Sequence, residues 1–320
     1  MTGKRLIALI AAALFSAGAV AQAYPSKPVR LLVPFSPGGT SDIVARLVAA
    51  KLSDELGQQF VVENRGGAGG TIATAIVAKA PPDGYLVLAG HQGVAFNATL
   101  YTKLPYDTAR ELQPLAMIGP TPNVLVTTNS FGPKNVQEFL ALAREKPGGI
   151  TYGSGGVGSA AHLSVELFEA MSQTRLSHIP YKGAGPALVD LVAGQIQCMV
   201  VTLPAAVTYI KGGKLKALAT SGAKRTPAMP ELPTIAEGGV PGYEFAPWYG
   251  WFLPAGTPRP IVERLNQAIN KAISAPALKE QFASLGLDPE PMTPERFGEI
   301  FTADIARWGA IIRKLQLKAD

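Results

Sequence analysis

Short apolar segments alternate with amphipathic helical segments along most of this chain, and glycine-rich turns connect many of them. Strand-like runs at 29–35 (VRLLVPF), 59–65 (QFVVENR) and 85–90 (YLVLAG) enclose two helical patterns, and the alternation restarts at 123–130. A strand, helix, strand order favours parallel strands with helices packed on both faces of the sheet. We therefore expect an α/β fold whose sheets are mostly parallel and flanked by helices.

The alternation forms two series, which predicts two lobes rather than one domain. A chain of 320 residues is long enough for two hydrophobic cores. Two long helical patterns, 260–285 and 294–317, close the chain and need a sheet to cover. We expect them to return to the first sheet, so that 24–124 and 248–320 form one lobe and 125–247 an inserted second lobe.

The first 23 residues have the pattern of a secretory signal peptide. Lys4 and Arg5 precede an apolar run over 6–20, and a small-x-small cleavage site follows at 21–23. The apolar run is shorter than the ~20 residues of a membrane-spanning helix. We expect residues 1–23 to be removed and the mature protein to reside in the periplasm.

Charge and composition disfavour several classes of function. The 29 basic and 23 acidic residues are scattered, without the basic cluster that is typical of nucleic-acid binding. The single cysteine, Cys198, lies in an apolar strand pattern and has no partner for an intrachain disulfide. The histidines His91, His162 and His178 lack metal-ligand spacing. We expect no nucleic-acid partner, no metal and no cofactor.

Three glycine-rich turns each join a strand to a helix: PFSPGGTSD at 34–42, NRGGAGGT at 64–71 and YGSGGVGSAAH at 152–162. Such a turn exposes the first N–H groups of a helix beside the positive end of its dipole, and together these bind anions. Helix capping alone explains each turn without a ligand. Asp42 either complements the helix dipole or accepts a hydrogen bond from a ligand through water. The first and third turns together predict an anion held between two lobes.

Two enzymatic interpretations compete with simple binding. The sequence GSGGVG at 153–158 satisfies the GxGxxG pattern of dinucleotide sites, but no acidic residue ends the next strand, which finishes as HIPYK. Ser159 precedes His162 by one helical turn, yet no GxSxG occurs and no acid is placed to complete a triad. We favour a binding protein that is not an enzyme. The alternative is a secreted α/β hydrolase or cofactor-dependent enzyme.

Several segments together resemble the periplasmic solute-binding proteins of the tripartite tricarboxylate transporter family, also called Bug receptors. They include YPSKPVRLLVPFSPGG, ENRGGAGG, YGSGGVGSAAHL, IPYKGAGPAL and FLPAGTP, spread over the mature chain. The resemblance implies a two-lobe Venus-flytrap receptor that closes on a small carboxylate and delivers it to inner-membrane permease subunits. A receptor that presents its ligand to a sensor kinase differs only in partner. We expect the protein to be a monomer.

The resemblance also implies which residues contact the ligand. One carboxylate group is expected to be held by backbone N–H groups, hydroxyls and bridging water from the turns of both lobes. The matching residues are Pro37, Gly38, Gly39, Thr40, Asp42, Ala68, Gly69, Ser154, Gly158, Ser159 and His162. The far end of the ligand is expected to face His91, Gln92, Tyr181, Lys182, Val201 and Thr202.

Two departures from the family pattern concern that far end. Val201 stands where family members often carry an aspartate, and His91-Gln92 replaces smaller residues. The first change removes a charge and leaves apolar surface, while the second adds hydrogen-bonding groups. We therefore expect an acid with an apolar or aromatic body, with a dicarboxylate as a further candidate.

Overall fold

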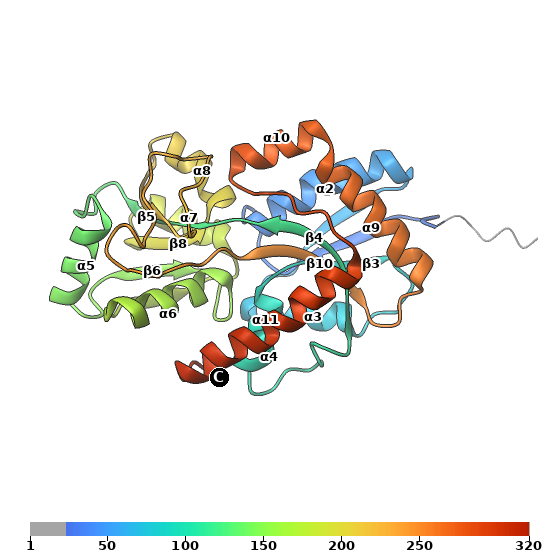
Figure 1. Ribbon diagram of the computed structural model, residues 1–320, viewed down its shortest axis with the longest axis horizontal. Coiled ribbons are helices and arrows are strands. Elements are labelled where there is room, and N and C mark those ends of the chain that lie inside the picture. Colours follow the sequence, from blue (N-terminus) through green and yellow to red (C-terminus); the bar gives the residue numbers. More distant parts are fainter. Residues whose placement is uncertain (1–23, 320) are drawn as a thin grey trace, which may run out of the picture.

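The computed structural model describes residues 24–319, so the expected signal peptide, 1–23, lies outside the described residues. Two five-stranded sheets form two lobes that lie side by side (Figure 1). The first sheet has the order β2-β1-β3-β10-β4 and the second β7-β6-β8-β5-β9. The first contains β1 (Val29–Val33), β2 (Phe60–Asn64), β3 (Leu86–His91), β4 (Leu112–Pro120) and β10 (Trp248–Pro254). The second contains β5 (Asn123–Thr128), β6 (Thr151–Ser154), β7 (Ser177–Pro180), β8 (Cys198–Thr202) and β9 (Leu215–Thr220).

Each sheet contains one strand that runs against its neighbours. β10 is antiparallel to β3 and β4, and β5 is antiparallel to β8 and β9, while the other pairings are parallel. Both exceptions are strands that arrive from the other lobe: β4 leads into β5 through Thr121 and Pro122, and β9 leads into β10 through 221–247. A strand that enters from the opposite lobe meets the sheet at its other end. The sheets are thus mixed, with four of five strands sharing one direction.

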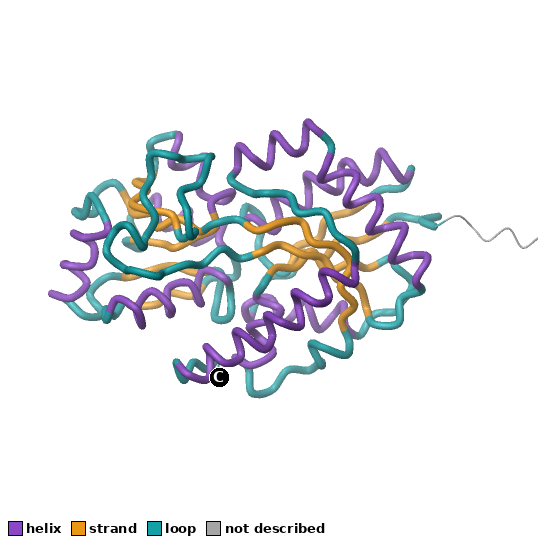
Figure 2. Tube along the Cα trace, in the orientation of Figure 1, coloured by secondary structure: helices purple, strands orange, loops and turns teal. Residues whose placement is uncertain are grey.

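Helices cover both faces of each sheet (Figures 1 and 2). The first lobe carries α2 (Thr40–Leu56), α3 (Thr71–Ala78), α4 (Gly93–Leu100), α9 (Arg259–Ser274), α10 (Pro276–Leu285) and α11 (Pro294–Lys314). The second carries α5 (Val136–Glu145), α6 (Ala160–Ser172), α7 (Ala184–Val192) and α8 (Leu203–Lys211). Along β1, Leu31 packs in one buried cluster and Leu32 in another. Burial on both faces explains why these strands are almost wholly apolar.

The C-terminal part differs from expectation in one respect. The pattern over 260–285 forms two helices, because Ala275 is extended (ψ 133°) before Pro276. A residue before proline is restricted to extended backbone, and this ends α9. In α11, Trp308 packs on Phe245 with ring centroids 5.2 Å apart and belongs to the core of the second lobe. α11 therefore contacts both lobes.

The sequence did not predict two elements of the structure, α4 and β4. α4 (GVAFNATL) is buried on nearly every side, and even its Asn97 is buried, so it has no polar face to reveal a helical period. β4 contains Pro114 and Gly119, which are unusual inside strands. Tertiary burial, rather than local preference, produces both elements.

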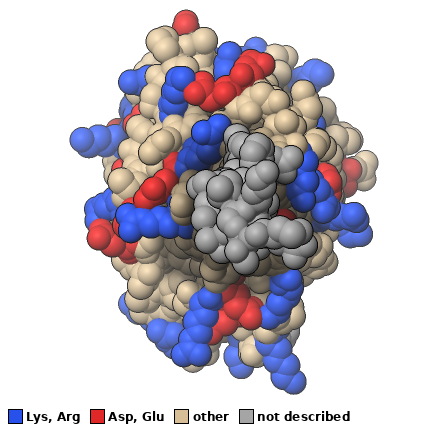
Figure 3. Space-filling view, turned by 90° about the vertical axis from the view of Figure 1, so that its right-hand side faces the viewer, with Lys and Arg blue, Asp and Glu red and all other residues tan. Residues whose placement is uncertain are grey.

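Charges are mixed on the face of the molecule in Figure 3, where blue basic and red acidic side chains are interspersed outside the grey area. No basic patch of the kind that binds nucleic acid gathers on the part of that face that is visible. Across 24–319, none of the helices combines the length and the apolar character needed to cross a bilayer.

Candidate functional site

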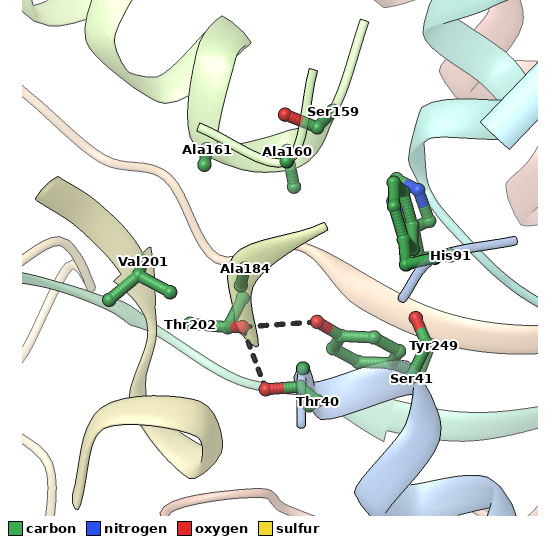
Figure 4. Close-up of a pocket in the computed structure, with 13 residues that line it drawn as sticks. Thr40, Ser41, His91, Ser159, Ala160, Ala161, Ala184, Val201, Thr202 and Tyr249 are labelled. Carbon is green, nitrogen blue, oxygen red and sulfur yellow. Dashed lines mark hydrogen bonds between the residues drawn. The ribbon is translucent and has the colours of Figure 1, made fainter. Parts of the chain in front are cut away.

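A cavity of about 40 Å³ lies between the lobes, at the ends of strands from both sheets (Figure 4). It is large enough for a few water molecules in this arrangement of the lobes. The first lobe contributes Phe35, Gly39, Thr40, Ser41, His91 and Tyr249. The second contributes Gly155, Ser159, Ala160, Ala161, Ala184, Val201 and Thr202. Among these lining residues, none carries a lysine, arginine, aspartate or glutamate charge.

The N-termini of α2, α6 and α7 meet at this cavity. Thr40 and Ser41 open α2, Ala160 and Ala161 open α6, and Ala184 opens α7, and all five line the cavity. The first N–H groups of a helix have no acceptor within their own helix, and the dipole adds positive potential there. Three helix starts from two lobes thus form a candidate anion site without a charged side chain.

Three hydroxyl groups connect the lobes at one wall of the cavity (Figure 4). Thr202 Oγ1 lies 2.8 Å from Thr40 Oγ1, and the Tyr249 hydroxyl donates to Thr202 Oγ1 at 3.1 Å. Burial raises the pKa of Tyr249 to about 12, so its hydroxyl keeps its proton at neutral pH. The cluster therefore provides hydroxyl donors from both lobes within one network.

His91 forms part of the aromatic wall. Its Nδ1 accepts the Gly93 N–H at 2.9 Å, and its ring lies 4.9 Å from that of Phe35. Burial lowers the pKa of His91 to about 3, so the imidazole is neutral at pH 7 and carries its proton on Nε2. With Phe35 beside it, this wall is neutral and largely apolar, and Val201 adds apolar surface elsewhere in the lining.

Asp42 braces the first-lobe turn instead of lining the cavity. Its carboxylate accepts the Gly38 N–H at 3.1 Å, Arg46 Nε at 3.0 Å and Asn64 Nδ2 at 3.0 Å. Burial alone would raise the pKa of Asp42, but the hydrogen bonds from Arg46, Gly38 and Asn64 outweigh it and lower the pKa. The carboxylate is thus used inside the turn, where it also complements the start of α2.

The second-lobe turn also uses several of its own polar groups internally. The Gly156 N–H donates to Ser154 Oγ at 3.0 Å, and the Gly158 N–H donates to His162 Nδ1 at 3.4 Å. The Ser159 N–H donates to the Gly156 carbonyl at 3.0 Å. This differs from our expectation that the Gly158 and Ser159 N–H groups receive the carboxylate. The next two residues, Ala160 and Ala161 at the start of α6, line the cavity.

Several of the glycines serve the contact between the lobes. A Cβ at Gly66 would lie 2.4 Å from the Lys182 carbonyl oxygen, one at Gly69 2.0 Å from that of Val157, and one at Gly185 2.1 Å from that of Pro37. Each of these carbonyls belongs to the other lobe. At these positions the absence of a side chain therefore admits the backbone of the opposite lobe.

Of the expected residues, the cavity brings together Gly39, Thr40, His91, Ser159, Val201 and Thr202. The structure places eleven elsewhere: Pro37, Gly38, Asp42, Ala68, Gly69, Gln92, Ser154, Gly158, His162, Tyr181 and Lys182. Gln92 differs most, because its amide donates to Asp304 at 2.6 Å beside the Trp248 indole N–H. Tyr181 donates to Asp190, and Lys182 uses its backbone carbonyl, which accepts the Ser36 N–H at 2.9 Å.

Sequence reasoning missed seven lining residues: Phe35, Ser41, Gly155, Ala160, Ala161, Ala184 and Tyr249. Four of them, Ser41, Ala160, Ala161 and Ala184, open helices that directly follow glycine or capping residues, and this signal was available. Nothing local marks Phe35 or Tyr249, since each belongs to a mostly apolar run, VRLLVPF and WYGWFLP. Within residues 24–319, no group of three or more His, Cys, Asp or Glu side chains is arranged to hold a metal ion.

The sequence matches the receptor of the tripartite tricarboxylate transporter family over residues 44–317. It is 39% identical over 321 residues to the UPF0065 protein in the tcbD–tcbE intergenic region of Pseudomonas sp. strain P51, covering 99% of this chain and 96% of that one. It is 36% identical over 324 residues to Protein BugT of Bordetella pertussis, covering 99% of both.

Solved structures agree with this match. R. palustris Rpa4515 with adipate is 38% identical with a TM-score of 0.89, covering 92% of this chain and 99% of that one. MatC from Rhodopseudomonas palustris with bound malate is 34% identical with a TM-score of 0.86, covering 90% and 100%. These matches cover at least nine-tenths of the chain and so extend through both lobes. The chain therefore belongs to the tripartite tricarboxylate transporter receptor family.

Proposed function

We propose that the protein is a periplasmic receptor that closes its two lobes on a small carboxylic acid and delivers the acid to inner-membrane permease subunits. The observation that carries the proposal is the convergence of the α2, α6 and α7 N-termini on one uncharged cavity. A carboxylate there is matched by N–H and O–H donors from both lobes, so it favours the closed state. The adipate and malate bound by relatives support this class of ligand.

The lining favours an acid with an apolar body. Phe35, Val201 and the neutral His91 present carbon surface or a single N–H donor. A tricarboxylate such as citrate would bring charges that no basic lining residue offsets, and burying an unpaired charge is costly. We therefore propose a monocarboxylate or dicarboxylate with an aliphatic or aromatic body.

A panel of acids tests this proposal. Purified mature protein is screened by thermal shift against adipate, malate, benzoate and citrate, and the hits are measured by calorimetry. A micromolar ligand corresponds to about −8 kcal/mol and raises the melting temperature in proportion to its occupancy. We expect adipate or benzoate to bind and citrate to bind poorly. Tight binding of citrate alone would contradict the proposed ligand class.

One pair of side chains deserves comparison with an enzyme. Ser154 Oγ lies 2.6 Å from His178 Nε2, which is the spacing of a nucleophile and its base. Ser154 is fully buried, however, and does not line the cavity. A buried hydroxyl cannot attack a substrate, so we propose a receptor without catalysis. Turnover of a carboxylate ester by the purified protein would contradict this.

Export, lobe boundaries and partners complete the proposal. We propose that residues 1–23 direct export, that the lobes comprise 24–124 with 248–320 and 125–247, and that the receptor is a monomer. Cell fractionation together with the N-terminal sequence of the mature protein tests export, and light scattering tests the monomer. Copurification with permease subunits or with a sensor kinase distinguishes the two classes of partner.

A further inference from the structure

Three aromatic rings stack behind the second-lobe turn, away from the cavity. The His178 ring on β7 lies between Tyr152 on β6 and His162 on α6, with centroids 4.7 Å apart on each side. Glu166 lies one turn after His162 on α6, and its Oε1 is 3.3 Å from His162 Nε2. None of these residues lines the cavity. The stack nevertheless contacts the turn that ends there.

The Ser154 hydroxyl determines which nitrogen of His178 carries the proton. Ser154 Oγ accepts the Gly156 N–H, and it lies 2.6 Å from His178 Nε2. Among the described residues, His178 Nε2 is the group placed to accept the hydroxyl proton of the fully buried Ser154. If Nε2 carried a proton instead, this hydroxyl would be left without an acceptor, which is costly in a buried site.

The charge state of His178 agrees with this arrangement. Burial, followed by the neighbouring His162, lowers the pKa of His178 to about 4, and Glu166 opposes the shift. His178 is therefore neutral at pH 7 and can accept a proton at Nε2. At a second point of the turn, His162 Nδ1 accepts the Gly158 N–H at 3.4 Å. Two imidazoles thus hold the turn from behind at two points.

We infer that His178 is a positioning residue for ligand binding, because its Nε2 accepts the Ser154 hydroxyl proton and so holds the turn that presents the α6 N–H groups to a carboxylate. The inference rests on the proposed function for the ligand, but the geometry behind the turn does not depend on it. His178 acts through Ser154 and Gly156 and does not contact the cavity.

The first experiment uses the ligand-free protein. Long-range ¹H–¹⁵N correlation spectra at pH 7 show which ring nitrogen of each histidine is protonated. We expect an unprotonated Nε2 and a protonated Nδ1 in His178. A protonated Nε2 overturns the inference, whether or not any acid binds.

The second experiment compares variants by amide exchange at Gly156. His178→Phe keeps a ring in the stack but removes the acceptor, and His178→Gln restores an acceptor near the position of Nε2. We expect exchange at Gly156 to be at least tenfold faster in His178→Phe and near wild type in His178→Gln. Unchanged exchange in His178→Phe overturns the inference. If His178→Phe fails to fold, Ser154→Ala replaces it, because it removes the same hydrogen bonds with a smaller change.

The third experiment titrates adipate into the same proteins. We expect about tenfold weaker binding in His178→Phe, rescue to within about twofold in His178→Gln, and no change in Tyr152→Phe, which alters the same stack without touching Ser154. Equal adipate affinity in wild type and His178→Phe overturns the inference. If neither adipate nor any other acid of the panel binds wild type, the proposed function fails, and the tautomer and the Gly156 exchange still decide the geometry.

Discussion

The two turns that bring helix N-termini to the cavity look alike in sequence but are held in different ways. The first-lobe turn is held by an ionised carboxylate, because Asp42 accepts from Gly38 and from Arg46. The second-lobe turn is held by two imidazoles, because the rings of His178 and His162 lie against Ser154 and Gly158.

The contrast shows that two turns of similar sequence can be held in place by side chains of different charge. An ionised carboxylate that receives several hydrogen bonds stays charged across ordinary pH, and Asp42 has a lowered pKa. A neutral imidazole loses its acceptor when it is protonated. The two turns should therefore respond differently to substitution and to pH, although the helices that follow both of them begin at the cavity.

The largest expected effect comes from glycines at matching places in the two turns. Gly38 and Gly158 have φ values of +86° and +83°, so alanine is strained at both by about 1–2 kcal/mol. A Cβ at Gly158 would also lie 2.2 Å from Asn97 Oδ1 in the other lobe, whereas at Gly38 the nearest atom is 3.5 Å away. We expect Gly158→Ala to weaken adipate binding more than 100-fold by preventing closure, and Gly38→Ala about tenfold. Calorimetry measures both, and equal losses would contradict the difference between the turns.

Removal of the charge that supports the first-lobe turn should have the next largest effect. In Asp42→Asn, the new amide NH₂ group faces the N–H donors that the carboxylate accepted, and the ion pair with Arg46 is lost. This change should lower the free energy of unfolding by about 2 kcal/mol. Because the folded pKa is below the usual value, this stabilisation is present above pH 3.8 and is lost as the pH falls further. Urea unfolding of Asp42→Asn and of Asp54→Asn, exposed on the same helix, measures it. Equal unfolding free energies would show that Asp42 does not brace the turn.

Mild acid should distinguish the two supports. Burial lowers the pKa of His178 to about 4 and that of His91 to about 3. Between pH 6.5 and these values, the two histidines are therefore protonated in the unfolded chain but neutral in the folded protein. Stability should thus fall as the pH drops from 6.5 towards 4, by about 1–2 kcal/mol for the half-buried His178. Urea unfolding at pH 7 and pH 5 measures the loss, which should be smaller in His178→Gln. An equal loss in that variant would argue against the neutral imidazole.

The smallest expected effect is a gain in stability when Glu169, near the second-lobe ring stack, is replaced. Burial and the nearby Glu166 raise the pKa of Glu169 to about 7, so its contribution to stability falls as the pH rises from 4.5 through 7. Glu169→Gln should stabilise the protein by less than about 1 kcal/mol at pH 8 and leave it unchanged at pH 4. Melting temperatures at the two pH values test this. A loss of stability at pH 8 would mean that the carboxylate of Glu169 is favourably paired.

Some parts of the site followed from local sequence, and others did not. Thr40 and Ser159 were predictable, because a glycine turn and a hydroxyl residue before an amphipathic pattern mark a helix start. Gln92 lies outside the cavity lining, and the sequence around it gives no sign of Asp304, 212 residues later, which accepts a hydrogen bond from its amide. Tyr249 and Phe35 reach the cavity only because separate strands end side by side.

The sequence by itself determined the α/β class, the two series of elements and the helix starts that follow the glycine turns. Those features depend on periodicity and on capping, which act within a few residues. The tertiary structure decided which residues line the cavity, which glycines let the two lobes approach each other and which side chains support the turns. The reason is that these contacts form only after strands from distant parts of the chain pack together, as for Gly66 with Lys182 and for Ser154 with His178. The glycine turns were visible in the sequence. Which of their glycines line the cavity and which lie against the opposite lobe was not.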